Sequence, residues 1–428
     1  MKRSCLKSAI AAIGAFSLIT LSACSSNEPT VSSTPHTSEK SDIRSVEDAC
    51  NIALAFLEAG NDISASRSED AIANVKIGYG ATSRSGAADT LFYSVNLAND
   101  GGFVLVSAPT AAEPVLAYVE NGSYDPAQPS DNPGFNLFIE KSKEYTSLAN
   151  TVTAIGGPIT VDKPYSIVRH AEPSLKVNWG QEFPEGMFCP NGISGCVQTA
   201  MAQILSYFEQ PTKLELTYPE RDRDLVVLNW TEIKKHINSC SDSLEAINIH
   251  IQNCEASEES HKSLAYLCRE LGYRNNADYD KSVTGALSSD ANSVYKELLP
   301  TRTVTDYSPF NSSCFDNLIS KMVSHKAVAH FRGRGKTFEG AHAWVCEGGR
   351  HYEHHTRILY ANGEEYIKNE YYFYFNWGKD GERNGYFLGD VYDPSKALQK
   401  EDLPPTLDGF TPFSRSGYSE NVHYYMIY

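Results

Sequence analysis

The sequence is poor in positive charge: 37 Lys and Arg residues stand against 53 Asp and Glu residues, for a formal net charge of -16 over 428 residues. Such an excess of negative charge repels phosphate backbones, so we expect no nucleic-acid partner. After residue 21 no apolar run is long enough to cross a bilayer, which argues against a further membrane segment.

Signals for a metal or a cofactor are also few. The ten cysteines form no Cys-x-x-Cys pair, which argues against a zinc ribbon, and no His-Glu-x-x-His motif appears. One histidine-rich stretch could hold a metal but lacks that spacing, so we interpret it as a solvated strand edge or turn; it comprises His351, Glu353, His354 and His355. We therefore expect no metal ion and no cofactor.

The first 24 residues have the order of a bacterial export signal, with lysine and arginine ahead of an apolar run from Ala9 to Leu21. The run ends in Leu-Ser-Ala-Cys, which resembles the lipobox in which Cys24 becomes the lipidated first residue of the mature protein. An ordinary signal peptide cut nearby is the alternative. We expect an exported protein, anchored by lipid to the cell envelope or surface, with release after maturation left open. Residues 25–43, rich in Ser, Thr and Pro, would form a flexible tether.

Residues 44–150 have the pattern of a small α+β domain. Helical spacing over Val46–Leu57 and Phe135–Tyr145 predicts two helices. Alternating or apolar runs predict three strands, with a hairpin signal at residues 99–102 between the first two: Leu91–Leu97, Phe103–Ser107 and Val115–Tyr118. Residues 151–172 carry few periodic signals, and we interpret them as a connector that contains a cleavage site.

Residues 173–428 would form a second, larger domain. Apolar positions at helical spacing predict helices over Cys196–Phe208 and Glu258–Leu271. The last third is rich in predicted strands: Ala327–Phe331, His342–Glu347, Arg357–Tyr360, Tyr371–Asn376, Tyr386–Leu388 and Val422–Tyr428. Seven cysteines lie in this domain; an exported location permits disulfides, and the spacing leaves their pairing open.

Cys196 is the candidate nucleophile, because it follows Gly195 and opens a predicted helix. The positive end of the helix dipole favours a thiolate at this position. His342, at the start of a predicted strand, could take the thiol proton and return it to a leaving amine. Asn376, at the end of another strand, could orient that imidazole through its amide oxygen. A buried structural role is the alternative for Cys196 and for His342, each taken alone.

Two further residues complete this candidate site. The Cys196 backbone N–H is one donor of an oxyanion hole, and the side-chain amide of Gln181 is a candidate for the other. Trp377, next to Asn376, could cover the hydrogen bond between Asn376 and His342 and exclude water.

The order Gln, Cys, His, Asn with these neighbours resembles peptidase family C10, the streptopains, within the papain-like clan. Three local matches carry the resemblance: GCVQTAMAQI from Gly195 to Ile204 is similar to the family's GCVATAMAQI, GAHAWV from Gly340 to Val345 to GGHAFV, and Asn376-Trp377-Gly378 to NWG. Residues 101–107 and 114–118 resemble the family's propeptide. Two departures concern specificity more than mechanism, namely Ala341 before the histidine and Lys379-Asp380 after NWG.

The resemblance implies a papain-like catalytic domain of two subdomains behind a small α+β propeptide. It implies that Cys196 is the nucleophile, His342 the general base and acid, and Asn376 the orienting group. Gln181 would be the oxyanion donor and Trp377 the shield. The small domain would be an intramolecular inhibitor removed by cleavage, and the partners would be protein or peptide substrates. The alternatives are a transpeptidase or amidase on the same scaffold and a catalytically silent surface lipoprotein that acts in binding or adhesion.

Overall fold

The computed structural model describes residues 43–62, 71–82, 88–128, 130–154, 160–162, 165–236, 256–279, 284–335, 341–358, 365–393 and 422–428. The predicted signal, the lipidation site Cys24 and nearly all of the tether lie outside the described residues. Residues Asp42–Tyr428 form one compact unit, and all that follows concerns that unit. Within the described ranges, none of the helices has the length and apolarity needed to cross a membrane.

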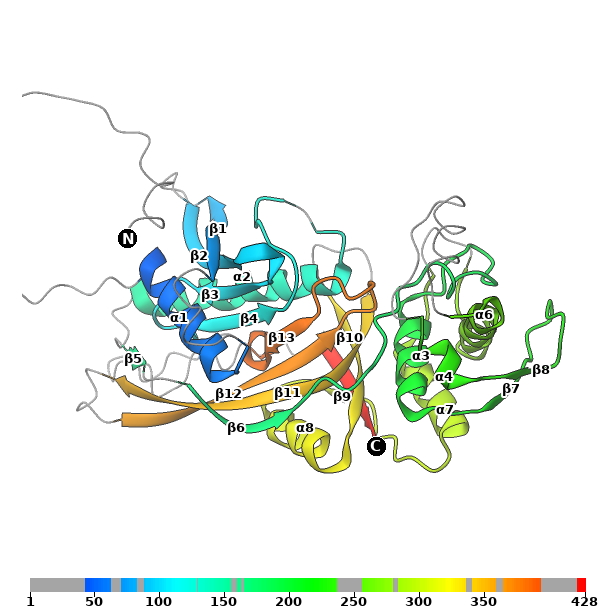
Figure 1. The fold of residues 1–428 in the computed structure, drawn as a ribbon. Coiled ribbons are helices and arrows are strands. Elements are labelled where there is room, and N and C mark those ends of the chain that lie inside the picture. Colours follow the sequence, from blue (N-terminus) through cyan, green and yellow to red (C-terminus); the bar gives the residue numbers. More distant parts are fainter. Residues whose placement is uncertain are drawn as a thin grey trace, which may run out of the picture. The chain divides into compact units, whose positions relative to one another are not determined.

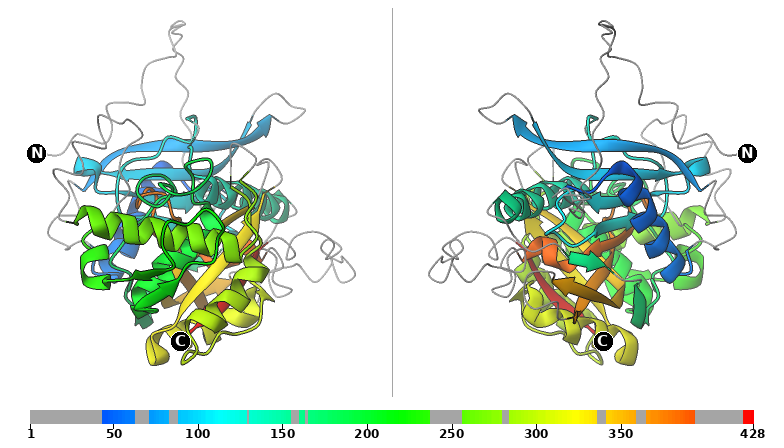
Figure 2. Two further views of the ribbon diagram at one scale, coloured as in Figure 1. Left: turned by 90° about the vertical axis from the view of Figure 1, so that its right-hand side faces the viewer. Right: turned by 90° about the vertical axis from the view of Figure 1, so that its left-hand side faces the viewer.

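The small N-terminal part combines an antiparallel four-stranded sheet with two helices that pack against it (Figures 1 and 2). Its elements are α1 (Val46–Ala59), β1 (Ile72–Thr82), β2 (Ala88–Leu97), the 3₁₀ turn η2 (Ala98–Asp100), β3 (Phe103–Ser107), β4 (Val115–Val119) and α2 (Pro133–Ala154). Helix α1 begins with a capping box in which the side chains of Ser45 and Asp48 each bond the other's backbone N–H. The expected hairpin forms at η2, and Gly102 takes a φ of +98° there, which favours glycine.

The larger part begins with two short strands and alternates helices with strands before its main sheet. Its elements are β5 (Thr160–Asp162), β6 (Ser166–Ala171), α3 (Cys196–Phe208), β7 (Lys213–Glu215), β8 (Leu225–Val227), α4 (Trp230–Ile233), α6 (Glu258–Arg274), α7 (Ser288–Leu298), β9 (Ser308–Pro309), α8 (Ser312–His325), β10 (Val328–Arg334), β11 (Ala341–Ile358), β12 (Glu365–Asn376), β13 (Gly385–Leu388), η3 (Gly389–Tyr392) and β14 (Val422–Ile427). Figure 1 shows α3, α4, α6 and α7 grouped beside the β7–β8 hairpin.

One sheet runs through both parts of the chain, in the order β1-β2-β3-β4-β13-β12-β11-β10-β14-β9, with β5 and β6 paired to β11. The junction is the antiparallel pair β4 and β13, where Tyr118 lies opposite Tyr386. Gly385 permits this pairing, because a Cβ there would lie 2.8 Å from the Val119 Cα. The small part is therefore hydrogen-bonded edge to edge onto the larger one.

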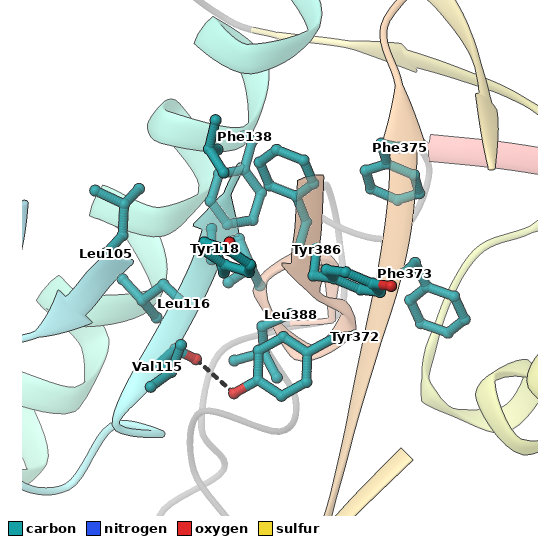
Figure 3. Packing of buried hydrophobic residues seen from close by; sticks show 14 of the residues in the cluster. Leu105, Val115, Leu116, Tyr118, Phe138, Tyr372, Phe373, Phe375, Tyr386 and Leu388 are labelled. Carbon is teal, nitrogen blue, oxygen red and sulfur yellow. Dashed lines mark hydrogen bonds between the residues drawn. The ribbon is translucent and has the colours of Figure 1, made fainter. Parts of the chain in front are cut away.

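The hydrophobic core continues across that junction. Figure 3 shows Leu105, Leu116 and Phe138 of the small part facing Tyr372, Phe375 and Leu388 of the larger part. The Tyr372 hydroxyl donates a hydrogen bond to the Val115 carbonyl oxygen at 2.9 Å (Figure 3). A second core lies around α3, α4, α6 and α7 and includes Ala343 and Val345 of β11. Strand β11 thus has one face on each core.

Many of the expected elements are present. Helix α3 has the expected bounds, and the helices expected at Val46 and Glu258 are slightly longer than predicted. Two expected strands merge into the 18-residue β11. Strand β1 and helices α7 and α8 were not anticipated, and the expected connector holds the end of α2 together with β5 and β6. Strands β5 and β6 are defined by their pairing with β11, and no local sequence pattern reveals that pairing.

Candidate active site

Cys196 is the first residue of α3, and Gly195 before it makes the sharp entry to the helix. Gly195 has a φ of +95°, and a Cβ there would lie 2.8 Å from the Thr284 Cγ2 and 2.7 Å from the Gln198 Oε1. The helix buries its apolar residues in the second core, which fixes the orientation of the first turn. The half-buried Cys196 side chain is thereby held at a helix N-terminus on a rigid element.

The Cys196 thiol lies against the start of β11. Strand β12 pairs with β11 only as far as Val345, so residues 341–343 extend past its end. The Ala343 N–H faces the Cys196 sulfur there, and Arg332 lies opposite Ala343 on β10. Burial raises the pKa of the Cys196 thiol, while the Ala343, Val197 and Cys196 N–H groups and the Arg332 charge act to lower it. The raised pKa means a neutral thiol in this form of the protein.

His342 is buried, and its ring is held on the other side of β11. Its Nε2 lies 2.8 Å from the Trp377 carbonyl oxygen, and its ring is near-parallel to that of Trp344, with an interplanar angle of 15°. Burial lowers the pKa of His342 to about 4, and the Lys379 charge also lowers it, while the bond to the Trp377 carbonyl acts in the opposite direction. The imidazole is therefore neutral here.

The small domain contacts this histidine directly. At Gly134, in the first turn of α2, a Cβ would lie 2.9 Å from the His342 Cδ2 and closer still to the Trp377 ring. Side chains of a strand alternate between faces, so Trp344 and His342 turn toward the first core while Ala343 turns toward the second. The structure thus brings Cys196 and the His342 segment together, with the imidazole under the small domain and bonded to Trp377.

Asn376 makes different contacts from those expected. Its amide nitrogen donates to the Val177 carbonyl oxygen at 3.1 Å and to the Glu347 Oε1 at 3.3 Å, and its oxygen accepts from the Gly378 N–H. The position expected for the Asn376 oxygen next to the imidazole is taken by the Trp377 carbonyl. Asn376 instead fixes the turn that presents this carbonyl and ties it to the segment leading to Gln181.

Gln181 lies in a loop pinned to the approach of α3. Its carbonyl oxygen accepts from the Ser194 N–H at 2.8 Å and from the Ser194 hydroxyl at 3.1 Å. The Thr199 hydroxyl, inside α3, donates to the Gly180 carbonyl oxygen at 2.9 Å. These bonds hold the Gln181 backbone beside the residues that lead directly into Cys196.

Trp377 is fully buried between the two parts. Its indole N–H donates to the Arg383 carbonyl oxygen at 2.9 Å, and its ring lies 5.0 Å from Phe387 and 5.1 Å from Trp344, centroid to centroid. Gly134 lies against this ring, from the side of the small domain. The shielding role expected for Trp377 stays a prediction, and the bond to His342 beside the ring is made by the Trp377 carbonyl and not by Asn376.

Glu347 is a site-adjacent residue that the sequence interpretation did not single out. It is buried, accepts from the Leu175 N–H at 2.6 Å and from Asn376, and burial raises its pKa to about 7. A glutamate directly after the apolar run from Ala343 to Cys346 is the available signal, because a charged residue on a buried strand requires a partner.

The interpretation of the histidine-rich stretch as a solvated edge is wrong for two of its members. His351 and His354 are buried, at 4% and 1% exposed. His351 stacks on Tyr371, and its Nε2 lies 2.7 Å from the Asn369 Oδ1. Strand β11 lies between β6 and β12, and each histidine is covered on its own face of the sheet, His351 by Arg169 and Tyr371 and His354 by Tyr165 and Glu370.

Polar contacts join the small domain to the larger one beyond the shared sheet. Arg350, on β11, forms a two-pronged ion pair with Asp62, with N–O distances of 2.6 and 2.8 Å. The Tyr374 hydroxyl donates to the Glu120 carboxylate at 2.7 Å. The guanidinium of Arg350 also lies 3.9 Å above the centre of the Tyr386 ring. The small domain is therefore anchored on both sides of the β4–β13 junction.

Comparisons with known proteins match both parts of the chain. Residues 177–387 match the model of the Peptidase C10 family, and residues 40–146 match that of the Spi protease inhibitor. Streptopain of Streptococcus pyogenes is 24% identical over 374 residues, covering 82% of this chain and 86% of streptopain. The thiol protease/hemagglutinin PrtT of Porphyromonas gingivalis is 24% identical over 339 residues, covering 72% of this chain and 34% of PrtT.

Among solved structures, a fragment of prointerpain A from Prevotella intermedia superposes on this chain with a TM-score of 0.50. The two are 16% identical, and the match covers 83% of this chain and 98% of that fragment. This likeness confirms the expected fold, a papain-like α+β catalytic domain preceded by a small α+β domain.

Proposed function

Because the chain is a cysteine peptidase of the C10 family that carries a Spi-type propeptide, we propose that it is the zymogen of an exported endopeptidase whose nucleophile is Cys196. The observation that carries the proposal is the placement of Cys196 at the start of α3, against the backbone of the His342 segment. The substrates would be proteins or peptides, and the propeptide would be the intramolecular inhibitor.

In the proposed reaction, the Cys196 thiolate adds to a peptide carbonyl carbon to form a tetrahedral intermediate, and collapse of this intermediate breaks the C–N bond. The tetrahedral oxyanion is held by the Cys196 backbone N–H and the Gln181 side-chain amide. The His342 imidazolium gives its proton to the leaving amine, which leaves a thioester between the acyl group and Cys196. His342 then takes a proton from water as the hydroxide attacks the thioester. The C–S bond breaks, the acyl group leaves as a carboxylic acid, and the proton on His342 restores the Cys196 thiol.

Inhibition follows from the protonation states that burial imposes. With the thiol pKa raised and the His342 pKa near 4, both groups are neutral at pH 7, and the reactive thiolate–imidazolium pair is disfavoured. Loss of the propeptide would remove the contact at Gly134, expose His342 to solvent and free its ring to turn toward the thiol. Cleavage between the domains would thus activate the enzyme.

The Trp377 carbonyl supports an assignment of the orienting group that differs from the sequence expectation. A carbonyl that accepts from one ring nitrogen leaves the other available for the Cys196 proton, which is the task of a third catalytic group. In this proposal Asn376 acts as a positioning residue, through the turn that holds Trp377 and the Val177 segment.

Export and lipidation at Cys24 complete the proposal and depend on the lipobox-like signal alone. Growth of the producing cells with labelled palmitate tests this point. The full chain should incorporate label, and a Cys24→Ala variant should not; equal labelling of both would overturn lipidation without touching the protease assignment.

The decisive experiment compares residues 25–428 as wild type, Cys196→Ala and Cys314→Ala, in reductant, with casein as substrate. Cys314 is a half-buried free cysteine away from α3, so its variant controls for the loss of a thiol. We expect the wild type and Cys314→Ala to shed the propeptide and digest casein, and Cys196→Ala to do neither. If none of the three processes itself, and all remain inert even after trypsin removes the propeptide, the chain is a silent lipoprotein that acts by binding.

A further inference from the structure

Three buried side chains from both domains converge at the interface between the propeptide and the protease. Glu113 lies just before β4, and His354 and Glu370 lie on β11 and β12. Their exposed fractions are 9%, 1% and 0%. The three facing atoms, Glu113 Oε2, His354 Nε2 and Glu370 Oε1, all lie within 4.8 Å of one another. None of these residues belongs to the candidate active site.

The outer atoms of both carboxylates are held by other groups. The Lys368 ammonium lies 3.0 Å from the Glu113 Oε1, and the Tyr372 hydroxyl donates to the Glu370 Oε2 at 2.7 Å. The inner oxygens, Glu113 Oε2 and Glu370 Oε1, are buried and face the His354 Nε2, which lies 3.7 Å from the first and 2.5 Å from the second. Each carboxylate therefore points one oxygen into the space that it shares with His354, with its orientation fixed from outside, as is usual for metal ligands.

We propose that Glu113, His354 and Glu370 form a divalent-metal site, and that zinc is the ion that fits it best. One imidazole nitrogen and two carboxylate oxygens are a common three-ligand set for zinc, and a buried carboxylate pair requires a positive charge between its members. A site lined only by oxygen would favour magnesium or calcium, whereas the imidazole selects a transition metal.

The site is divided between the two domains, which gives the ion a role in regulation. Glu113 comes from the propeptide, while His354 and Glu370 come from the protease, so all three ligands are present only while the propeptide is docked. An ion that binds the docked state alone stabilises it by mass action. Bound zinc would thus hold the propeptide on the protease and keep the zymogen inactive. This consequence depends on the proposed inhibitory role of the propeptide. Binding of zinc to the three residues does not depend on that role.

The alternative arrangement is a metal-free ion cluster in which a protonated His354 and Lys368 balance the two glutamates. The two arrangements differ in their response to zinc, because zinc must displace the His354 proton. Titration calorimetry with zinc chloride on the EDTA-treated, dialysed Cys196→Ala zymogen separates them. We expect the Cys196→Ala zymogen to bind one zinc ion per chain. The added substitution Glu113→Gln should weaken the affinity for zinc about tenfold or more.

Glu120→Gln is the matched control, since Glu120 is also a propeptide glutamate that contacts the protease but lies outside the cluster. This variant should bind zinc with the same affinity as the Cys196→Ala zymogen that carries no further substitution. Glu370→Gln is a second test should Glu113→Gln fail to fold, which circular dichroism reveals. No stoichiometric binding below about 0.1 mM zinc, or equal binding by all variants, would overturn the site.

The locking role is read from trypsin cleavage of the same inactive zymogen, which requires no activity from this protein. Zinc should slow the release of the propeptide from the Cys196→Ala zymogen and from its Glu120→Gln variant. It should not change the rate of release from the Glu113→Gln variant. Binding without any change in cleavage would refute the lock and retain the site. Failure of the casein experiment would instead refute the proposed protease function and leave the calorimetry unaffected.

Discussion

The Nε2 atom of His342 lies 2.8 Å from the backbone carbonyl oxygen of Trp377. Both residues are covered from the propeptide side by Gly134. The general base of the proposed mechanism is therefore held as a buried, neutral ring by a bond to the main chain. Its release is the event on which activation depends, and the predictions below follow from that arrangement.

The first prediction concerns the reactivity of Cys196 with iodoacetamide. The thiol pKa lies above the ordinary value of 9.0 in the zymogen, so at pH 7 the thiolate is under about 1% of the total. Alkylation of Cys196 in the intact zymogen should therefore become fast only above pH 9. The processed enzyme should react at least tenfold faster at pH 6, where an imidazolium pairs with the thiolate.

Peptide mapping by mass spectrometry measures this rate at Cys196 alone, with the half-buried Cys314, which is present in both forms, as an internal comparison. A zymogen that alkylates at pH 6 as fast as the processed enzyme would show that the propeptide does not suppress the thiolate.

The second prediction concerns Gly134→Ala. The new methyl group would overlap the Trp377 ring and approach the His342 Cδ2, so it should weaken propeptide docking by about 1 to 3 kcal/mol. Self-processing in reductant, followed on gels, should then become about 5- to 150-fold faster. Alanine itself favours helix, so α2 should remain intact.

Gly80→Ala is the control, because Gly80 lies on β1 of the propeptide. Its methyl group would meet the end of the Leu91 side chain at 3.3 Å and make an ordinary contact with the Asp89 carbonyl oxygen at 3.7 Å. Its processing rate should match that of the wild type. Equal rates for all three proteins would mean that α2 does not restrain His342.

The third prediction concerns Asp62→Asn. Arg350 is buried, at 3% exposed, and loses its anionic partner in this variant. An uncompensated buried charge typically costs about 3 to 5 kcal/mol, so urea unfolding of the Cys196→Ala zymogen should show a loss of this order. Asp125→Asn removes a partner of the exposed Lys76, at 3.3 Å, and should cost under about 1 kcal/mol. If both variants lose a similarly small free energy of unfolding, the Asp62–Arg350 pair does not anchor the propeptide.

The fourth prediction concerns Glu347 and pH. Burial raises its pKa from 4.5 to about 7, so the folded protein holds a proton there that the unfolded chain has lost between these two values. The stabilisation from this proton is fully present below about pH 4.5 and is lost as pH rises through about 7. The slope in this window should be about 1.4 kcal/mol per pH unit, for a total of about 3 kcal/mol.

Glu347→Gln cannot titrate, so its free energy of unfolding relative to the parent zymogen should improve by that amount between pH 4.5 and 8. Other buried groups titrate in both proteins and cancel in the difference. Urea unfolding of both in the Cys196→Ala background measures it. A difference that does not change with pH would place the pKa of Glu347 at its ordinary value.

Local sequence patterns were sufficient for much of the fold. Helix α3, with Cys196 as its first residue, follows from apolar spacing and from Gly195, because helix formation depends on neighbours one turn apart. Strands β3 and β4 follow from short apolar runs for the same reason. The C10 resemblance added the pairing of Cys196 with His342, and the fold and family that it implied are confirmed. The catalytic roles of the site residues remain predictions: Gln181, Cys196, His342, Asn376 and Trp377.

Tertiary structure alone decided which group contacts His342, what covers it and how the two domains join. The Trp377 carbonyl is a backbone atom that every residue possesses, so no side-chain pattern marks it. Gly134, Asp62 and Glu113 meet their protease partners across more than 200 residues of sequence, and β4 pairs with β13 over a similar separation. Contacts of this range depend on the register of the whole sheet. The burial of His354, read from sequence as solvated, has the same cause.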